Sequence, residues 1–191
     1  MGDLWVLLAW GFLFMIFWML FLWVWQWKRR VSGMENAGWS SGLLILAFLY
    51  AIKADGYGPR RFLIAALVGL ASGFLARRSW VMGKPAEPVG FRGLWVFEGR
   101  AIQAVFLSLP VALLAIDPLP GLTVYEWAGL LIWAIGMGGQ IFAETRRSIF
   151  EWLIWVAYFV AALATPYGPW TIICPLLMLP RLIETKQTIE S

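Results

Sequence analysis

The chain contains no histidine among its 191 residues, and this absence narrows its possible chemistry. Histidine is the commonest acid or base at neutral pH and the usual imidazole ligand for zinc, haem or chlorophyll metal. Its absence also excludes Ser-His and Cys-His nucleophile pairs. Cysteine is almost as scarce, because Cys174 stands alone and so forms no disulfide within the chain. We therefore expect no catalytic residue of these kinds and no metal site.

Charge is scarce as well. Charged residues make up 14% of the chain and hydrophobic residues 61%, and the mean hydropathy is +0.75. Soluble domains usually have about 25% charged and 45 to 50% apolar residues. We expect one membrane-embedded domain over residues 1–191. The net charge of +4 does not indicate a nucleic-acid partner, since the basic residues stand at the ends of apolar segments.

What the chain has instead is a long run without charge, from Leu4 to Trp27, that ends at Lys28-Arg29-Arg30. At about 1.5 Å per residue it reaches roughly 36 Å, enough to cross a hydrocarbon core of about 30 Å. A signal peptide would carry its basic residues before the apolar run, whereas here Asp3 comes first. The run is predicted to be a retained membrane span.

Further apolar segments predict an all-α, multi-pass membrane bundle of about seven spans. The predicted spans are 4–27, 39–52, 62–76, 102–116, 124–142, 149–164 and 170–180. Several are shorter than the roughly 20 residues of a straight span, so we expect their helices to include flanking residues.

The distribution of basic residues predicts the orientation. With the N-terminus outside and the C-terminus in the cytoplasm, twelve of the 15 basic residues are cytoplasmic, as the positive-inside rule expects. The twelve are Lys28, Arg29, Arg30, Arg77, Arg78, Lys84, Arg92, Arg100, Arg146, Arg147, Arg181 and Lys186. The three assigned to the outside are Lys53, Arg60 and Arg61.

Local patterns predict helix starts and turns. The sequences Thr123-Val-Tyr-Glu126 and Ser148-Ile-Phe-Glu151 fit the capping box, so we interpret both glutamates as caps rather than catalytic acids. Turns are expected at 118–121 and at Thr165-Pro-Tyr-Gly-Pro169.

Small residues at a spacing of four predict close helix contacts inside the molecule. They are Gly69 with Gly73 and Ala157 with Ala161. The glycines at 136, 138 and 139 indicate a closely packed or loosened helix, and Gln26 is expected to bond a neighbouring helix.

Several segments resemble bacterial membrane proteins related to steroid 5-alpha reductases. The stretch Ser32-Gly-Met-Glu-Asn36-Ala-Gly-Trp39-Ser-Ser-Gly-Leu43 resembles the start of their second helix, with asparagine in place of the usual aspartate. The residues Ala76-Arg77-Arg78, Gly83-Lys84 and Glu87 resemble the segment after their third helix. Matches continue at Gln103, Ser108-Leu109-Pro110, Glu151-Trp-Leu-Ile-Trp155 and Trp170-Thr-Ile-Ile-Cys-Pro175-Leu-Leu-Met178. This family is identified as seven-span enzymes that use NADPH to reduce a carbon double bond in a lipid.

The chain departs from the family where the family does its chemistry. The segment Glu144-Thr-Arg-Arg147-Ser-Ile-Phe-Glu151 lacks the family's cofactor-gripping motif, and Phe91 stands where its proton-donating tyrosine is expected. Gln140 replaces a usual carboxylate, and the tail after Pro180 is short. If the chain is an NADPH enzyme, its candidate cofactor-binding residues are Glu87, Arg92, Arg100, Gln140, Arg146 and Arg147. Arg77 and Arg78 are further cations that could meet the phosphates.

The sequence therefore favours a non-catalytic subunit or scaffold of a larger complex in the cell inner membrane, without cofactor. Its expected partners are membrane lipids and other membrane subunits, which could carry lipophilic cofactors. The alternative is an NADPH-dependent reductase of a lipid, sterol or isoprenoid. Aromatic residues occur all around the first span, and Phe14, Phe17 and Trp18 near its middle are predicted to dock the partner.

Overall fold

The computed structural model describes residues 2–29, 34–81, 91–142 and 147–179, and every regular element in these ranges is a helix. The α-helices are α1 (Gly2–Arg29), α2 (Met34–Lys53), α3 (Gly58–Val81), α4 (Phe91–Leu107), α5 (Leu109–Ile116), α6 (Val124–Phe142), α7 (Arg147–Ala162) and α8 (Ile173–Leu177). A short 3-10 helix, η1 (Gly168–Ile172), precedes α8. The predicted all-α class is confirmed for this part of the chain.

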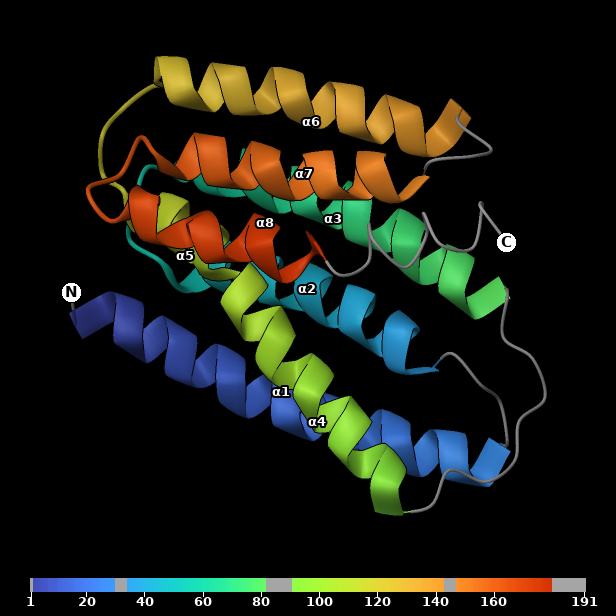
Figure 1. Cartoon of the computed structure of the whole chain (residues 1–191). Coiled ribbons are helices and arrows are strands. Elements are labelled where there is room, and N and C mark those ends of the chain that lie inside the picture. The colour runs from blue at the N-terminus through green and yellow to red at the C-terminus, as the bar shows by residue number, and fades with distance from the viewer. Residues whose placement is uncertain (1, 30–33, 82–90, 143–146, 180–191) are drawn as a thin grey trace.

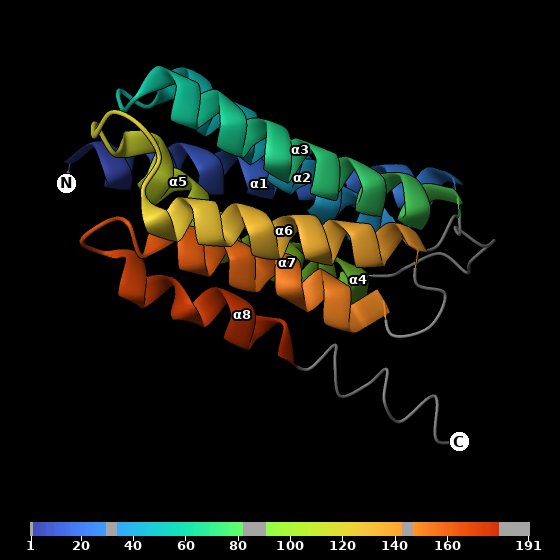
Figure 2. The same cartoon turned by 90° about the horizontal axis from the view of Figure 1, so that it is seen from above.

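The helices lie side by side in one elongated bundle, and successive passes run in opposite directions (Figures 1 and 2). The connections between α2 and α3, between α5 and α6 and between α7 and η1 lie at the end where α1 begins, which we call the N end (Figure 1). α1 lies along one side of the bundle, and α6 lies on the other side against α7 (Figure 1).

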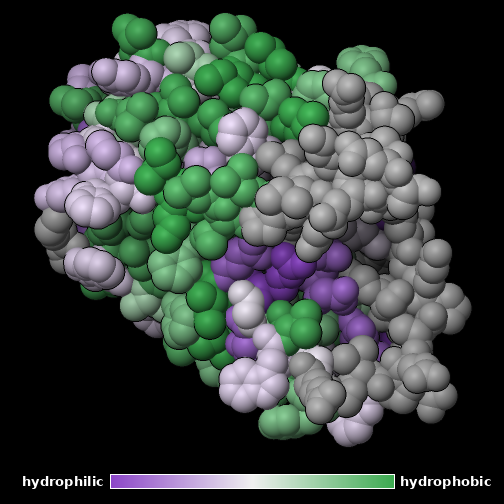
Figure 3. All heavy atoms as spheres, in the orientation of Figure 1, coloured by the Kyte–Doolittle hydropathy of each residue, from purple (hydrophilic) through white to green (hydrophobic). Residues whose placement is uncertain are grey.

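Three described helical segments are long and apolar enough to cross a membrane: Asp3–Arg29, Gly58–Ser79 and Gly93–Ile116. Shorter apolar helices are Ser148–Ala162 and Gly168–Leu177. Hydrophobic residues cover much of the face seen in Figure 3, which a protein in contact with lipid requires. Strongly hydrophilic residues gather in one area of that face, below its middle.

The helices extend beyond most of the predicted spans, as expected for short apolar segments. α2 begins at Met34 rather than at residue 39, and α3 begins at Gly58 rather than at residue 62. The span predicted at 124–142 coincides with α6, whereas the span predicted at 102–116 is divided between α4 and α5. The segment predicted at 170–180 is divided between η1 and α8.

α1 has one buried stripe, although its apolar residues occur all around it. The buried residues recur every three or four positions, the period of one helix face: Leu4, Leu7, Gly11, Met15, Met19, Leu22 and Gln26. Met15 and Met19 fit against Gly42 and Gly38 of α2, where an added Cβ would collide with their side chains or with Leu22. Two glycines of α2 therefore determine which face of α1 turns inward.

Small residues also hold α6 against α7. A Cβ added to Gly129 would lie 2.7 Å from the carbonyl oxygen of Ala157 and 2.9 Å from Cβ of Ala161. A Cβ added to Gly136 would lie 3.0 Å from the carbonyl oxygen of Phe150. The predicted close packing at Ala157 and Ala161 is confirmed, and it lies within one chain. Gly69 and Gly73 likewise face Phe48 and Leu44 of α2.

The chain bends between α4 and α5 (Figure 1), where Ser108 separates the two helices and Pro110 is the second residue of α5. Proline has no N–H, so the carbonyl of Phe106 four residues earlier loses its helical donor. The thiol of Cys174 donates to that carbonyl, with an Sγ–O distance of 3.2 Å. The hydroxyl of Ser108 bonds Tyr50 of α2 at 3.0 Å, so the bend is stabilised from two neighbouring helices.

Candidate functional site

A buried charge cluster lies at the N end, where Arg60 of α3 meets two carboxylates. Its Nη1 lies 3.0 Å from Oδ2 of Asp117, and its Nε lies 2.5 Å from Oε1 of Glu126. Arg60 also donates to the carbonyl oxygen of Gly121 at 2.7 Å. The side chain is only 1% exposed, so this guanidinium is held entirely by protein groups.

Two connections hold the cluster in place. The amide of Tyr57, which precedes α3, donates to the carbonyl oxygen of Asp117 at 3.0 Å. At the start of α6, the amide of Thr123 donates to Glu126 at 2.7 Å, and the hydroxyl of Thr123 accepts from the amide of Glu126 at 3.3 Å. The predicted capping box is confirmed here, and Glu126 serves both as a cap and as a partner of Arg60. Gly121 has a φ of +84°, which confirms the predicted turn.

From the sequence, Arg60 was expected only as a basic residue on the outer side of the membrane. Its burial inside the bundle was not predicted. One planar guanidinium offers five donors in a fixed fork, which suits it to two carboxylates and two carbonyls at once. The cluster joins the α2–α3 connection to the α5–α6 connection. Its geometry is that of a structural latch, because Arg60 is fully occupied by groups of the same chain.

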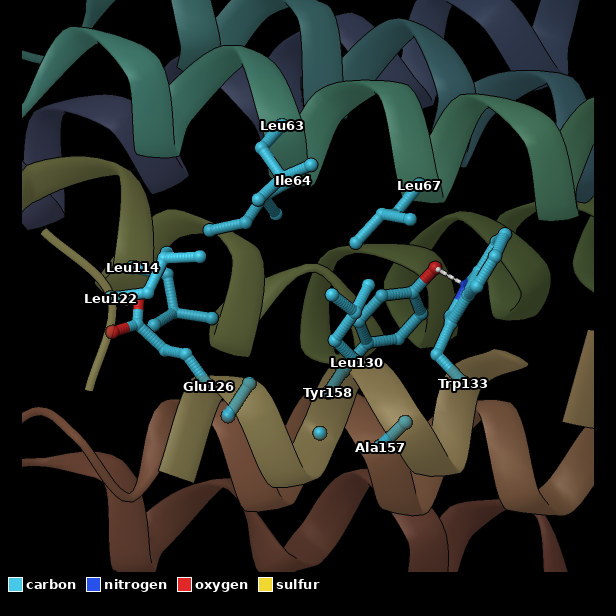
Figure 4. A pocket seen from close by; sticks show the side chains of 12 residues that line it. Leu63, Ile64, Leu67, Leu114, Leu122, Glu126, Leu130, Trp133, Ala157 and Tyr158 are labelled. Atoms are coloured by element: carbon cyan, nitrogen blue, oxygen red, sulfur yellow. Dashed lines mark hydrogen bonds between the residues drawn. The ribbon is translucent and has the colours of Figure 1, made fainter. Parts of the chain in front are cut away.

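A small apolar cavity lies beside the cluster, between α3, α6 and α7 (Figure 4). Leucines from several elements point into it, and the indole of Trp133 donates to the hydroxyl of Tyr158 at 3.0 Å along one side. Its volume is about 30 Å³. This is far below the roughly 300 to 1,000 Å³ of small-molecule sites, so it is a packing gap rather than a substrate pocket.

The predicted NADPH residues are only partly within the described structure. Glu87 and Arg146 lie outside the described residues, and the side chains of Arg92 and Arg147 are not described either. Arg100 on α4 donates to Oε1 of its neighbour Gln103 at 2.9 Å. The side chain of Gln103 in turn contacts the sulfur of Met178 at 3.9 Å.

Two predicted polar side chains are buried. Gln140 is buried in α6, at 2% exposure. Gln26 of α1 is buried too, but no hydrogen-bond partner for its Oε1 occurs among the described residues. The interhelical hydrogen bond was predicted for the Gln26 side chain as a whole, and its Oε1 forms none in this part of the chain.

The three predicted docking residues of α1 point in different directions. Phe17 is 62% exposed, whereas Phe14 and Trp18 are half-buried and pack against the core. The indole of Trp18 donates to the carbonyl oxygen of Gly38 and to the hydroxyl of Ser41, each at 3.2 Å. Trp10 is 61% exposed and lies two turns before Phe17 on the same side of the helix. We define the outer face of α1 as Trp10 and Phe17, with the exposed Leu13 and Leu20 beside them.

Over the described residues the protein is all-helical, with helices that can span a membrane, a latched N end and an exposed aromatic helix. Comparisons with protein-family models, with curated proteins and with solved structures found no match. The reductase-like relationship therefore stays a prediction from the sequence motifs.

Proposed function

We propose that this chain is a non-catalytic subunit or scaffold of a larger complex in the cell inner membrane, and that it binds a helix of another subunit through the outer face of α1. The observation that carries the proposal is the exposure of Trp10 and Phe17 on a helix that lies along one side of the bundle. Aromatic side chains dominate contact energies, because they bury large areas and lose few rotamers.

The position of Phe17 separates this proposal from a simple lipid contact. Aromatic belts occur where the membrane meets water, and they account for rings near the ends of α1 such as Trp5 and Trp27. Phe17 lies near the middle of a helix that runs from Gly2 to Arg29. A belt does not require an exposed ring at that depth, whereas a partner helix packed against α1 would cover it.

The described polar side chains support a structural role. Arg60 joins two connections, Ser108 stabilises the bend, and Trp133 ties α6 to Tyr158 of α7. Each of these groups bonds another part of the same chain. Such contacts hold the bundle together and thereby keep α1 exposed along one side of it.

We also propose seven membrane passes with the N-terminus outside and the C-terminus in the cytoplasm. In this orientation the N end faces outward, and Lys28, Arg29, Arg77 and Arg78 lie at the cytoplasmic border. A single cysteine introduced at exposed Leu119 should react with a membrane-impermeant reagent added outside, whereas one at Lys28 should not. The native Cys174 is buried and gives little background. The opposite labelling pattern would contradict the proposed orientation.

A double variant in which both Trp10 and Phe17 are replaced by leucine tests the outer face of α1. Because both rings are exposed, the double variant should insert and fold normally. Contact residues of this kind often contribute more than about 1 kcal/mol each, so partner binding should weaken at least about tenfold. Co-purification of the native complex in mild detergent measures this loss as a fall in partner stoichiometry.

Trp127→Leu is the matched control, since Trp127 is an equally exposed ring on α6. This control should keep the partner. Unchanged stoichiometry in the α1 double variant would exclude α1 as the docking helix. Purification of the wild-type chain alone, carrying bound NADPH, would contradict the subunit proposal itself.

A further inference from the structure

An apolar groove of about 410 Å³ opens between α1, α2 and α3, toward the end of the bundle opposite the N end. This volume falls within the range of about 300 to 1,000 Å³ that is usual for ligand sites. Small residues from two helices line it, namely Ala37 and Gly38 of α2 and Ala76 of α3. α1 and α3 both pack against α2, and the short side chains of Ala37 and Ala76 leave space open between them.

A ladder of four aromatic rings runs along α1 beside this groove. The ring centroids are 6.3 Å apart from Phe14 to Trp18, 5.9 Å from Trp18 to Phe21 and 5.8 Å from Phe21 to Trp25. The last three rings line the groove directly. At about 1.5 Å per residue, the ladder spans roughly 16 Å along the helix axis. It forms a continuous apolar wall along the helix that suits an extended hydrocarbon chain.

Positive charge stands where the ladder ends. The guanidinium carbon of Arg29 lies 5.5 Å from the ring centroid of Trp25, and exposed Arg77 of α3 lines the groove itself. The first turn of α2, which begins at Met34, also lines the groove, and the amides of a helix start favour a nearby anion. Glu35 lies in that turn but is not among the lining residues.

These charges lie at the depth in the membrane where lipid headgroups are expected. Arg29 ends one of the segments able to span a membrane, Asp3–Arg29, and Arg77 lies near the end of another, Gly58–Ser79. A lipid whose chain lies along the ladder would bring its phosphate to the end of the groove, where Arg77 lines it and Arg29 lies over the ring of Trp25. Chain and headgroup would therefore be bound by adjoining parts of one groove.

The groove offers little to a polar ligand. Its one hydroxyl, on Ser41, accepts from the indole of Trp18 and donates to the carbonyl oxygen of Gly38. Besides the indole N–H groups of Trp18 and Trp25, the guanidinium of Arg77 is the remaining polar side-chain group among the described lining residues. A nucleotide needs several directed hydrogen bonds for its base and sugar, whereas a phospholipid needs an apolar wall and a cationic rim.

We propose that this groove binds one anionic phospholipid, with an acyl chain along Trp18, Phe21 and Trp25 and its phosphate at Arg29 and Arg77. This proposal does not depend on the proposed docking, and the groove adjoins the outer face of α1 at Phe21, one turn after Phe17. Trp10 and Phe17 are not among its lining residues.

The test uses the full-length protein in mild detergent. Phosphatidylglycerol and phosphatidylcholine with the same acyl chains are added separately, and inorganic phosphate is added alone. Native mass spectrometry counts bound lipid, and thermal unfolding reports stabilisation. Phosphatidylglycerol should bind at one site at least about tenfold more tightly than phosphatidylcholine. Equal binding of the two lipids, or full stabilisation by phosphate alone, would overturn the proposal.

Two variants examine the two parts of the groove. Arg77→Gln should weaken phosphatidylglycerol binding about tenfold and phosphatidylcholine binding less, because the choline cation of phosphatidylcholine already offsets part of the attraction between its phosphate and the guanidinium groups. Ala76→Phe should weaken both lipids, because the new ring fills the groove. Arg61→Gln at the N end removes the same charge from the same helix and should bind lipid normally. Normal binding by both groove variants, once circular dichroism shows that they are folded, would exclude the groove as the site.

Discussion

Replacing Arg60 with glutamine is expected to lower the free energy of unfolding by about 3 to 5 kcal/mol. The change leaves the carboxylates of Asp117 and Glu126 buried, adjacent and without their cation. Two buried like charges repel each other, and neither retains the partner that offset its loss of hydration. The measurement is the unfolding midpoint of the purified protein in mild detergent.

Arg61→Gln is the matched control for this prediction. Arg61 adjoins Arg60 on the same helix but is half-exposed, and its Nε has no hydrogen-bond partner among the described residues. The control should shift the free energy of unfolding by less than about 1 kcal/mol, as surface charges do.

Glu126→Gln should also change the free energy of unfolding little. Glutamine can still accept from the amide of Thr123, and the pair of Arg60 with Asp117 remains. Equal stability of Arg60→Gln and Arg61→Gln would mean that the cluster does not act as a latch.

Replacing Gly56 with alanine is expected to destabilise the N end by adding a methyl group where two connections meet. An added Cβ would overlap the carbonyl oxygen of Ala115, and it would lie 2.7 Å from that of Asp117. These are backbone atoms, so the two connections must move apart rather than a side chain turning away. Overpacking of this kind costs about 1 to 3 kcal/mol. Separation would also lengthen the hydrogen bond from Tyr57 to Asp117 and weaken the hold on Arg60.

Gly58→Ala is the control two residues away. The nearest atom to its added Cβ is a guanidinium nitrogen of Arg61 at 3.9 Å, which is ordinary contact. Its unfolding midpoint should stay within a few degrees of the wild type, while that of Gly56→Ala falls clearly. A similar midpoint for both variants would show that the connections at the N end tolerate separation.

Features encoded within a few residues were predictable from the sequence. The capping box joins Thr123 to Glu126 over three positions, and both hydrogen bonds form. The turn at Gly121 and the close contact at Ala157 and Ala161 also follow from local residue types. In each case the residue alone carries the physical cause, which is a side-chain acceptor, a permissive backbone or a small volume.

The latch was not predictable in the same way. Asp117 and Glu126 lie 57 and 66 positions after Arg60, so no local pattern connects them. The sequence did show that the charges of Arg60, Asp117 and Glu126 border apolar segments at ends assigned to the same side of the membrane. Likewise, the inward turn of Trp18 depends on Gly38 and Ser41 of another helix. The period of Leu4, Leu7, Gly11 and Met15 would have identified the inward face of α1 and left Phe17 outside.

The separation of the latch residues along the chain also delays formation of the latch during synthesis. Arg60 is synthesised 57 to 66 residues before its two carboxylate partners. At about 5 to 20 residues per second, a ribosome needs roughly 3 to 13 s to supply them. During that interval α2 and α3 exist without the contacts that later close the N end. The latch therefore forms only after the second half of the chain has been synthesised and has packed against the first half.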